Sequence, residues 1–453
     1  MIKESNYWSL RNPCNWSELL DEIPLSRESE VSQAILHLKK YQAEWIDKKI
    51  SERKALLNNC LNLIVSKKTF LIDRLTIDIA KPRDTATEEF DYGLRLIHGA
   101  LENNYDEIDL TASKLYHCPR GIVGIISPWN NPFAIAINKI FTALLFGNPV
   151  IWKPALPASN ISKFIAQIFS ESGLGNFLTC LPGDDFTGDL IVSSGIDAIT
   201  FTGSTEIGKL ISRKTAELGI TFQAEMGGSN AAVILKDCPI ENFIQDLTRN
   251  IFSFSGQRCT GMRRLYIEKE IINKFNELFF ETLSQLKTGH PSDPTTFLGP
   301  LISPEAKNHM LKKISTLHKG VGIKNDIINR SNEIEEDCWL SPHIISFNDL
   351  ELSIFKEENF GPIVGIYPIN NLDEAILAHN QSSFGLLASL YTENQTSIDR
   401  FVSKCEVGMI TRNRCRPIFD VSAPFYGWKD SSIGIPEHGR WDLDFFTKTK
   451  VVY

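Results

Sequence analysis

The sequence predicts an α/β protein in which parallel strands alternate with helices. Up to about residue 101 the apolar residues recur at helical spacing. From Gly121 onward, short apolar runs alternate with helical segments, and a second series of the same kind begins after Glu225. Strand–helix–strand units are right-handed crossovers, so each series predicts a parallel sheet with helices on both faces.

Three helices are expected first. Ser26 is a candidate cap for a helix over residues 26–45, and further helices are expected over 51–64 and 86–101. The first series then predicts strands at 122–126, 150–152, 177–178, 199–201 and 221–222, separated by helices at 133–145, 159–170 and 204–218. The second series predicts strands near 232–235, 265–268, 363–367 and 387–391. The sequence shows no internal repeat and no long linker, so we expect the domains to be interleaved along the chain.

Composition narrows the class of protein. The chain has 453 residues, 42% hydrophobic and 23% charged, which is typical of a globular protein of about three domains. A net charge of -8 argues against a nucleic-acid or membrane-surface partner. The nine cysteines include no CxxC pair, so neither a disulfide framework nor a metal site is expected. With no apolar leader and no uninterrupted apolar span, we expect a cytoplasmic protein.

Three separated residues indicate acyl-transfer chemistry. Cys259 follows an apolar helical stretch, Glu225 ends a strand-like run, and Asn130 lies in a Pro-Trp-Asn segment. A thiol nucleophile, a carboxylate base and an amide donor are the groups that carry an acyl group through a thioester. A single cysteine is more often a small core residue, so the indication depends on the three occurring together.

A candidate phosphate-binding turn lies after the strand at 199–201. It contains Gly203, Ser204 and Gly208, and a helix starts there with Ser204 or Thr205 as its cap. Free N–H groups at a helix start attract anions such as a pyrophosphate. The spacing also approaches a P-loop, but Leu210 stands where that motif needs Ser or Thr. A plain strand–helix junction is the other alternative.

Two further segments are candidate cofactor contacts. Lys153 ends an apolar strand, at the sheet edge where α/β proteins bind ligands, although a lone lysine there is usually a solvated charge. Glu358 and Phe360 precede a Gly-Pro turn, and they are candidates to hold a ribose and to back a flat ring.

These residues resemble the motifs of the NAD(P)-dependent aldehyde dehydrogenase family, in the same order and from about residue 12 to residue 451. The matching segments are residues 128–130, 152–154, 201–208, 225–228, 256–259, 299–302, 357–362 and 424–429. The resemblance implies a Rossmann-like cofactor domain interleaved with a second α/β catalytic domain and a small bridging β-sheet. The implied boundaries are 1–106 and 120–227 for the cofactor domain, 228–428 for the catalytic domain, and 107–119 and 429–453 for the bridging element. Members associate through that element, which implies a homodimer or homotetramer.

The resemblance also assigns roles. Cys259 would attack the aldehyde, the side chain of Asn130 and the Cys259 N–H would hold the oxyanion, and Glu225 would activate water. For the NAD or NADP cofactor, Ser204 with Gly203 and Gly208 would receive the pyrophosphate. Trp152 and Lys153 would contact the adenosine side, and Glu358 and Phe360 would contact the nicotinamide side. Many NAD-preferring members have Glu three positions after the lysine; Leu156 stands there, which leaves the choice between NAD and NADP open.

The candidate substrate residues are Asn131, Asn138, Arg258, Arg414 and Phe425. Asn131 and Asn138 stand where members that oxidise apolar aldehydes often have aromatics. Arg414 belongs to a cluster with Arg412 and Arg416, and guanidinium groups near a polar mouth are suited to an anionic aldehyde. The alternatives are a solvated basic loop for the cluster and a structural ion pair for Arg258.

The sequence leaves three functions to be compared. The first is aldehyde oxidation to a carboxylic acid. The second is a CoA-acylating relative, which characteristically lacks a hydrolytic base at the position of Glu225. The third is a non-catalytic family member, which the intact Asn130, Glu225 and Cys259 disfavour.

Overall fold

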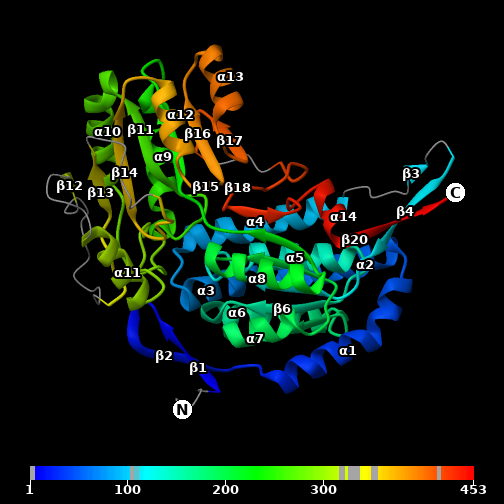
Figure 1. The fold of residues 1–453 in the computed structure, drawn as a ribbon. Helices are drawn as coiled ribbons and strands as arrows, with labels where there is room; N and C mark the ends of the chain where they lie inside the picture. The colour runs from blue at the N-terminus through cyan, green and yellow to red at the C-terminus, as the bar shows by residue number, and fades with distance from the viewer. Residues whose placement is uncertain are drawn as a thin grey trace.

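A computed structural model describes residues 6–102, 108–109, 112–315, 322–324, 337–347, 356–415 and 420–453. Figure 1 shows two α/β lobes side by side, with a β arm projecting from one of them. The predicted α/β architecture, with two parallel sheets and a small bridging sheet, is confirmed.

The sheet of the first lobe has six strands in the described residues, in the order β19-β9-β8-β5-β6-β7. Strands β5 to β9 are parallel, and β19 joins the edge antiparallel to β9. Their side chains alternate between two apolar clusters, with Val123 and Ile125 on one face and Ile122 and Ile126 on the other. The strands are β5 (Val123–Ser127), β6 (Val150–Pro154), β7 (Leu178–Cys180), β8 (Ala198–Thr202), β9 (Thr221–Glu225) and β19 (Ser432–Gly434).

Helices cover both faces of this sheet. One face carries α2 (Ile50–Ser66), α3 (Lys68–Asp78), α4 (Arg83–Glu102), α5 (Ala134–Leu145) and α6 (Ser159–Glu171). The other carries α1 (Glu28–Asp47), α7 (Asp185–Val192) and α8 (Thr205–Leu218). The expectation that Ser26 caps α1 was wrong, because the helix begins after Arg27. The backbone of Ser26 instead bonds Pro182 and Thr187, next to α7.

The second lobe has a sheet whose described strands run in the order β12-β13-β14-β11-β10-β16-β17. All neighbours are parallel except β12 and β13. The strands are β10 (Asn230–Ile234), β11 (Met262–Glu268), β12 (Gly322–Lys324), β13 (His343–Ser346), β14 (Ile363–Ile369), β16 (Leu387–Tyr391) and β17 (Met409–Arg412). One face packs on α9 (Ile244–Phe252) and α10 (Ile272–Ser284), and the other on α11 (Pro304–Ser315), α12 (Leu372–Asn380) and α13 (Gln395–Lys404).

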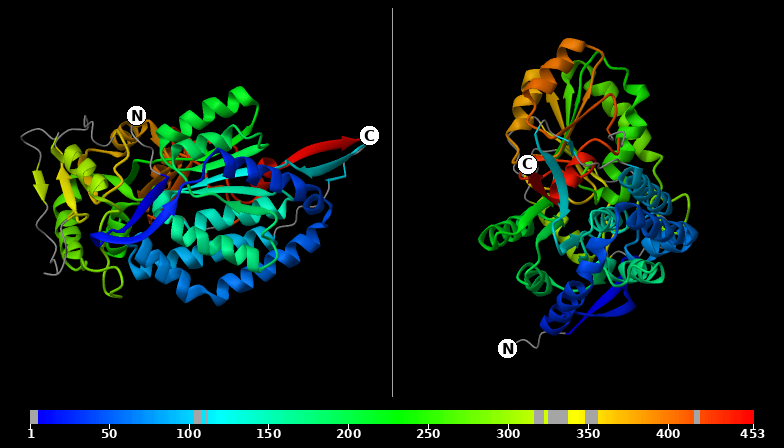
Figure 2. Two further views of the ribbon diagram at one scale, coloured as in Figure 1. Left: turned by 90° about the horizontal axis from the view of Figure 1, so that it is seen from below. Right: turned by 90° about the vertical axis from the view of Figure 1, so that its right-hand side faces the viewer.

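Smaller sheets connect and extend the lobes. The arm pairs β4 (Lys114–Pro119) with β20 (Thr447–Val452) and β3 (Ile108–Asp109), and Figure 2 shows it projecting beyond the body. A hairpin of β1 (Tyr7–Asn12) and β2 (Asn15–Pro24) lies at the other end, and β15 (Phe384–Gly385) pairs with β18 (Trp428–Lys429). The helix α14 (Arg440–Phe446) precedes β20. Within the segment expected to form the bridging element, β19 belongs to the six-stranded sheet.

Because strands β5 to β9 are parallel, their carboxyl ends lie together at one edge of the first sheet. The chain proceeds from β5 outward to β7, then returns to β8 on the opposite side of β5. Such a reversal leaves a crevice at the carboxyl ends of the strands, where ligands bind in open α/β sheets. Asn130, Lys153, Gly203 and Glu225 all lie at or just after these ends.

Candidate active site

Cys259 lies in a tight loop between the 3-10 helix η3 (Ser253–Gly256) and β11. Its side chain is partly exposed, and its carbonyl accepts a hydrogen bond from Nδ2 of Asn230 at 2.6 Å. Gly256 has a φ of 75°, and a Cβ there would lie 2.2 Å from the carbonyl oxygen of Gly361. Only glycine fits this turn, so the backbone fixes the position of the thiol.

Asn130 is held from both sides next to the Cys259 loop. Its Nδ2 donates to the carbonyl oxygen of Gln257 at 3.0 Å. The backbone carbonyl of Asn130 accepts a hydrogen bond from Nζ of Lys81 at 2.5 Å. The Lys81 ammonium also forms an ion pair with Glu89 and donates to Oδ1 of Asn131 at 2.7 Å. An amide nitrogen carries two hydrogens, so the second one can serve a further acceptor.

Glu225 ends β9 with its carboxyl group buried. Oε2 accepts a hydrogen bond from the Ser432 hydroxyl at 2.6 Å, and Oε1 has no partner among the described residues. Burial, and then the nearby carboxylate of Glu437, raise the pKa of Glu225 well above its ordinary value, against the opposing effects of Ser432 and Lys139. A carboxyl group with a raised pKa and a free oxygen suits proton transfer.

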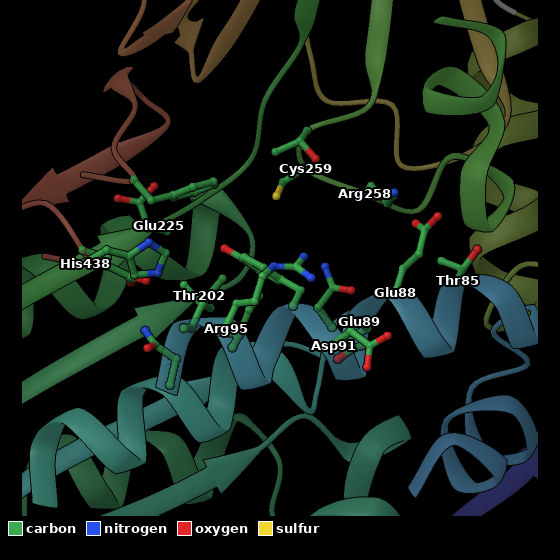
Figure 3. Close-up of a pocket in the computed structure, with 18 of the residues that line it drawn as sticks. Thr85, Glu88, Glu89, Asp91, Arg95, Thr202, Glu225, Arg258, Cys259 and His438 are labelled. Atoms are coloured by element: carbon green, nitrogen blue, oxygen red, sulfur yellow. The ribbon is translucent and has the colours of Figure 1, made fainter. Parts of the chain in front are cut away.

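One cavity of about 350 Å³ contains both Cys259 and Glu225 (Figure 3). Helix α4 forms one wall, where the acidic and basic side chains are those of Glu88, Glu89, Asp91 and Arg95. Asp91 pairs with Lys68 at 2.7 Å, whereas Arg95 is an exposed guanidinium on the cavity wall. The sequence interpretation missed Arg95. Its spacing of three and seven residues from Tyr92 and Glu88 is the signal that places these side chains on one helix face.

The predicted substrate residues divide into two groups. Asn131, Asn138, Arg258 and Phe425 line the cavity, and Nη1 of Arg258 donates to Oγ of Ser253 at 3.2 Å. Arg414 does not line it; its side chain is exposed. Arg412 is also exposed, 3.9 Å from Glu393, and Arg416 lies outside the described residues. The expectation that Arg414 lines the pocket was therefore wrong, because the next residue, Cys415, lines the cavity instead.

The Cys259 thiol is a weak acid in this environment. Burial, with smaller contributions from the carboxyl groups of Glu358 and Glu225, raises its pKa to about 12 against the lowering effect of Arg258. Since the thiolate is the reactive form, the thiol must lose its proton before it can attack.

The adenosine side of the crevice fits a dinucleotide in part. Ser204 caps α8, and its exposed side chain lies at the helix start, where N–H groups and the helix dipole attract phosphate. Gly203 donates its N–H to the Glu225 carbonyl at 3.1 Å, and a Cβ at Gly208 would lie 2.4 Å from the Met226 sulfur. Lys153 is nearly buried, and burial lowers its pKa against the opposing effects of Asp185 and Asp184.

The expectation that Trp152 contacts the adenosine side of the cofactor was wrong. Its indole is fully buried in the core, where Nε1 donates to the Ser127 hydroxyl at 2.9 Å. Strand β6 turns alternate side chains to opposite faces, so Trp152 packs inward and has no surface left for a ligand.

The predicted nicotinamide contacts, Glu358 and Phe360, lie near the Cys259 loop. Glu358 accepts a hydrogen bond from the Gly228 N–H at 3.1 Å, and burial raises its pKa to about 7. A Cβ at Gly227 would lie 2.6 Å from the Glu358 carboxylate, so glycine leaves room for this side chain. Phe360 packs edge-on against Trp129, with 5.7 Å between ring centroids. A carboxylate and a ring at this place fit a ribose and a nicotinamide.

The described residues contain neither a cluster of metal-binding side chains nor a membrane-spanning helix. No group of three or more His, Cys, Asp or Glu side chains suited to a metal ion occurs in the described ranges. None of the helices there is long and apolar enough to cross a membrane.

Comparisons with known proteins show the family to which the chain belongs. The model of the aldehyde dehydrogenase family matches residues 2–452. The chain is 27% identical to the alpha-ketoglutaric semialdehyde dehydrogenase of Bacillus subtilis, covering 98% of this chain and 94% of the relative. It is also 27% identical to a malonate-semialdehyde dehydrogenase of Listeria monocytogenes, covering 99% and 94%.

Among solved structures, the NADP-dependent glyceraldehyde-3-phosphate dehydrogenase of Bacillus halodurans, complexed with NADP, is similar with a TM-score of 0.91 and 27% identity. That match covers 99% of this chain and 96% of the other. A glyceraldehyde-3-phosphate dehydrogenase of Methanocaldococcus jannaschii, also with NADP, matches with a TM-score of 0.90 and 25% identity over 99% of both chains. The chain therefore belongs to the aldehyde dehydrogenase family and is an NAD(P)-dependent oxidoreductase.

Proposed function

We propose that the protein oxidises an anionic aldehyde to a carboxylic acid, with Cys259 as nucleophile, Glu225 as base and Asn130 as oxyanion donor. The observation that carries the proposal is the cavity itself. It brings the thiol and the base together with the guanidinium groups of Arg258 and Arg95. Thiol, base and cation in one enclosure match the needs of acyl chemistry on a negatively charged substrate.

The chemistry begins when Cys259 loses its proton and its sulfur attacks the aldehyde carbon. Asn130 donates its second amide hydrogen to the resulting oxyanion, together with the Cys259 N–H. NAD(P) would supply the hydride acceptor at this site, and loss of hydride from the bound aldehyde carbon would leave a thioester on Cys259. The Glu225 carboxylate then takes a proton from water, and the hydroxide attacks the thioester carbon. The acid is released and the thiol is restored.

Ser204 and the start of α8 would hold the pyrophosphate of the cofactor, and Lys153 the adenosine ribose. Glu358 would hold the nicotinamide ribose, with Phe360 beside the ring. The exposed helix start and the carboxylate beside Gly227 support this placement.

Charge within the cavity supports an anionic substrate. Arg258 and Arg95 line it together with five acids, of which Asp91 pairs with Lys68, Glu89 with Lys81 and Glu437 with Lys139. Burial raises the pKa of a fourth acid, Glu225, which favours its neutral form. The guanidinium of Arg258 and the amide of Asn138 line the cavity, where they can pair with a polar or anionic group of the substrate. The relatives named above are dehydrogenases of alpha-ketoglutaric and malonate semialdehydes and of a phosphorylated aldehyde, all of which are anionic.

The test compares kcat/KM for succinic semialdehyde and glyceraldehyde 3-phosphate with that for uncharged aldehydes of similar length. The anionic compounds should be preferred in the parent enzyme. Arg258→Ala should reduce that preference at least tenfold, because a charge-assisted hydrogen bond contributes about 1.5–3 kcal/mol. Arg258→Lys should restore part of it, and the comparison variant Arg414→Ala should leave it unchanged. Equal rates on alkanals in the parent enzyme would refute the anionic preference.

The acceptor of the acyl group is tested in the same assay. Water is the expected acceptor, since Glu225 lies in the cavity. Added CoA should neither accelerate turnover nor appear as an acyl-CoA product.

Assembly and location complete the proposal. We place the arm of β4 and β20 at the contact of a homodimer or homotetramer, because Val451 and Val452 are apolar and exposed there. Nine free thiols suit a reducing cytoplasm. Light scattering of the chain with and without residues 447–453 tests the assembly.

A further inference from the structure

The cavity contains a histidine that the chemistry above does not use. His438 lines the cavity with only 9% of its surface exposed, and Figure 3 shows its ring beside Glu225. Neither ring nitrogen has a hydrogen-bond partner in the described part of the chain, and neither is sealed off from the cavity. The His438 ring lies 5.9 Å from the ring of Phe425, measured between centroids. A buried polar group normally finds a partner, so this imidazole faces the space where a ligand would lie.

The backbone at His438 is strained. Its φ is 76°, in the left-handed region that a residue with a side chain seldom adopts. The backbone N–H donates to the Asp442 carboxylate at 2.9 Å, which holds the residue in this conformation. Strain of this kind is retained where the surroundings enforce it, often at a ligand site.

The side chain of Asn138 is also buried beside the cavity and without a hydrogen-bond partner among the described residues. It lines the cavity from α5 with 5% of its surface exposed, and no described residue bonds its side-chain amide. The residues beside these two, Lys139 and Glu437, form a buried ion pair. That pair holds α5 against the loop that carries His438, so the imidazole and the amide belong to one region of the cavity.

The chemistry of this region differs from that of Arg258. Burial lowers the pKa of His438 to about 4, with Glu437 opposing the effect and Lys139 adding to it, so the ring is neutral at pH 7. A neutral imidazole and an amide can each donate and accept a hydrogen bond. Lys139, a cation of this region, is already paired with Glu437 and is not available to an anion. A hydroxyl group is uncharged and both donates and accepts, so it matches the region.

We infer that His438 and Asn138 form a second subsite, which binds a hydroxyl group on the carbon next to the aldehyde while Arg258 binds the anionic end. The inference rests on the proposed function for the placement of the aldehyde at Cys259. Because His438 lies beside Glu225, which acts on the acyl carbon, the hydroxyl belongs close to that carbon. The substrate class is thus an anionic 2-hydroxyaldehyde rather than a plain semialdehyde.

Two matched pairs of anionic aldehydes test the subsite. Glyceraldehyde 3-phosphate is compared with 3-oxopropyl phosphate, and 3-hydroxy-4-oxobutanoate with succinic semialdehyde. Within each pair only the hydroxyl differs. The parent enzyme should show a higher kcat/KM for the hydroxylated member, by about tenfold for two hydrogen bonds in a buried site.

The variants separate the imidazole from the backbone. His438→Gly removes the ring without a backbone cost, because glycine accepts a positive φ. It should remove most of the preference for the hydroxylated member and change kcat/KM of the plain aldehyde less than twofold. His438→Asn tolerates the left-handed backbone, keeps a donor and an acceptor, and should retain part of the preference. Asn138→Ala should lower the preference in the same direction.

The outcomes distinguish the two proposals. If the parent enzyme has equal kcat/KM for the plain and the hydroxylated anionic aldehydes, the subsite is refuted. The proposed function is not affected by that result. A loss in His438→Gly that is equal for both members of a pair refutes it too, since that pattern indicates a structural role. The parent enzyme could instead oxidise only uncharged 2-hydroxyaldehydes and lose that activity in His438→Gly. This result would support the subsite and refute the proposal that the substrate is anionic.

Discussion

The Ser432 hydroxyl donates to Oε2 of Glu225 at 2.6 Å, although 207 residues separate the two in the chain. They are register partners of the antiparallel pair β19 and β9. A strand from the C-terminal part of the chain thus returns to the first sheet and supplies the hydrogen bond that the side chain of the candidate base accepts within the described residues. This bond favours the charged form of a carboxyl group that burial otherwise keeps protonated.

Ser432→Ala should shift the pH dependence of thioester hydrolysis upward. The hydrogen bond lowers the pKa of Glu225, so its removal raises that pKa and the carboxylate forms only at higher pH. Steady-state turnover should fall at pH 7 and recover as the pH rises. Ser431→Ala is the control, because the Ser431 hydroxyl accepts from the Gly385 N–H and does not bond Glu225. An unchanged pH profile in Ser432→Ala would contradict the role of Glu225 as base.

Cys259→Ala and Glu225→Gln should separate the two halves of the reaction. Without the thiol no thioester forms, so Cys259→Ala should lose both NAD(P)H formation and ester hydrolysis. Glu225→Gln should still give a burst of NAD(P)H of up to one per site, followed by turnover reduced about 10²- to 10⁴-fold. Stopped-flow absorbance measures both phases. Undiminished steady-state turnover in Glu225→Gln would exclude the assignment.

Gly256→Ala should misplace Cys259. Its Cβ would lie 2.2 Å from the Gly361 carbonyl, and the φ of 75° adds a strain of about 1–3 kcal/mol. We expect a lower melting temperature and loss of nearly all activity. Gly173→Ala provides the matched control, since its φ is 85° but nothing lies within 4 Å of its Cβ. That variant should bear the backbone strain alone and keep its kcat.

Alkylation of Cys259 should be slow at neutral pH in the protein without cofactor. The pKa of about 12 leaves little thiolate at pH 7, and the rate should rise about tenfold for each pH unit up to pH 10. Arg258 lowers this pKa, so Arg258→Met should slow the reaction further. Mass spectrometry of the iodoacetamide adduct follows the rate. A fast, pH-independent reaction would show that the thiol is already ionised.

Leu156→Glu should shift the cofactor preference toward NAD. Leu156 begins a short 3-10 helix directly after β6, which carries Lys153. A carboxylate there would accept from a ribose hydroxyl and repel a 2′-phosphate, a difference of about 1–3 kcal/mol. Comparison of kcat/KM for NAD and NADP measures the change, with Leu156→Gln separating charge from size. A gain in NADP preference would contradict the placement of the adenosine.

The sequence alone determined the fold class and pointed to the three candidate catalytic residues. Alternating strand and helix periods gave the α/β lobes, and Cys259, Glu225 and Asn130 lie at strand ends and tight loops that local patterns mark. Ser204 was placed as a helix cap for the same reason. These features depend on neighbours along the chain, which the sequence displays directly.

Only the tertiary structure decided which distant side chains meet. Trp152 turned into the core because of the alternation of a buried strand, and Arg414 stayed outside the cavity that Cys415 lines. Arg95 and His438 were missed because their contact with the cavity depends on how α4 and the loop before α14 pack against distant elements. Burial also decides the pKa values of Glu225 and Cys259, since desolvation depends on everything packed around a group and not on its neighbours in the chain.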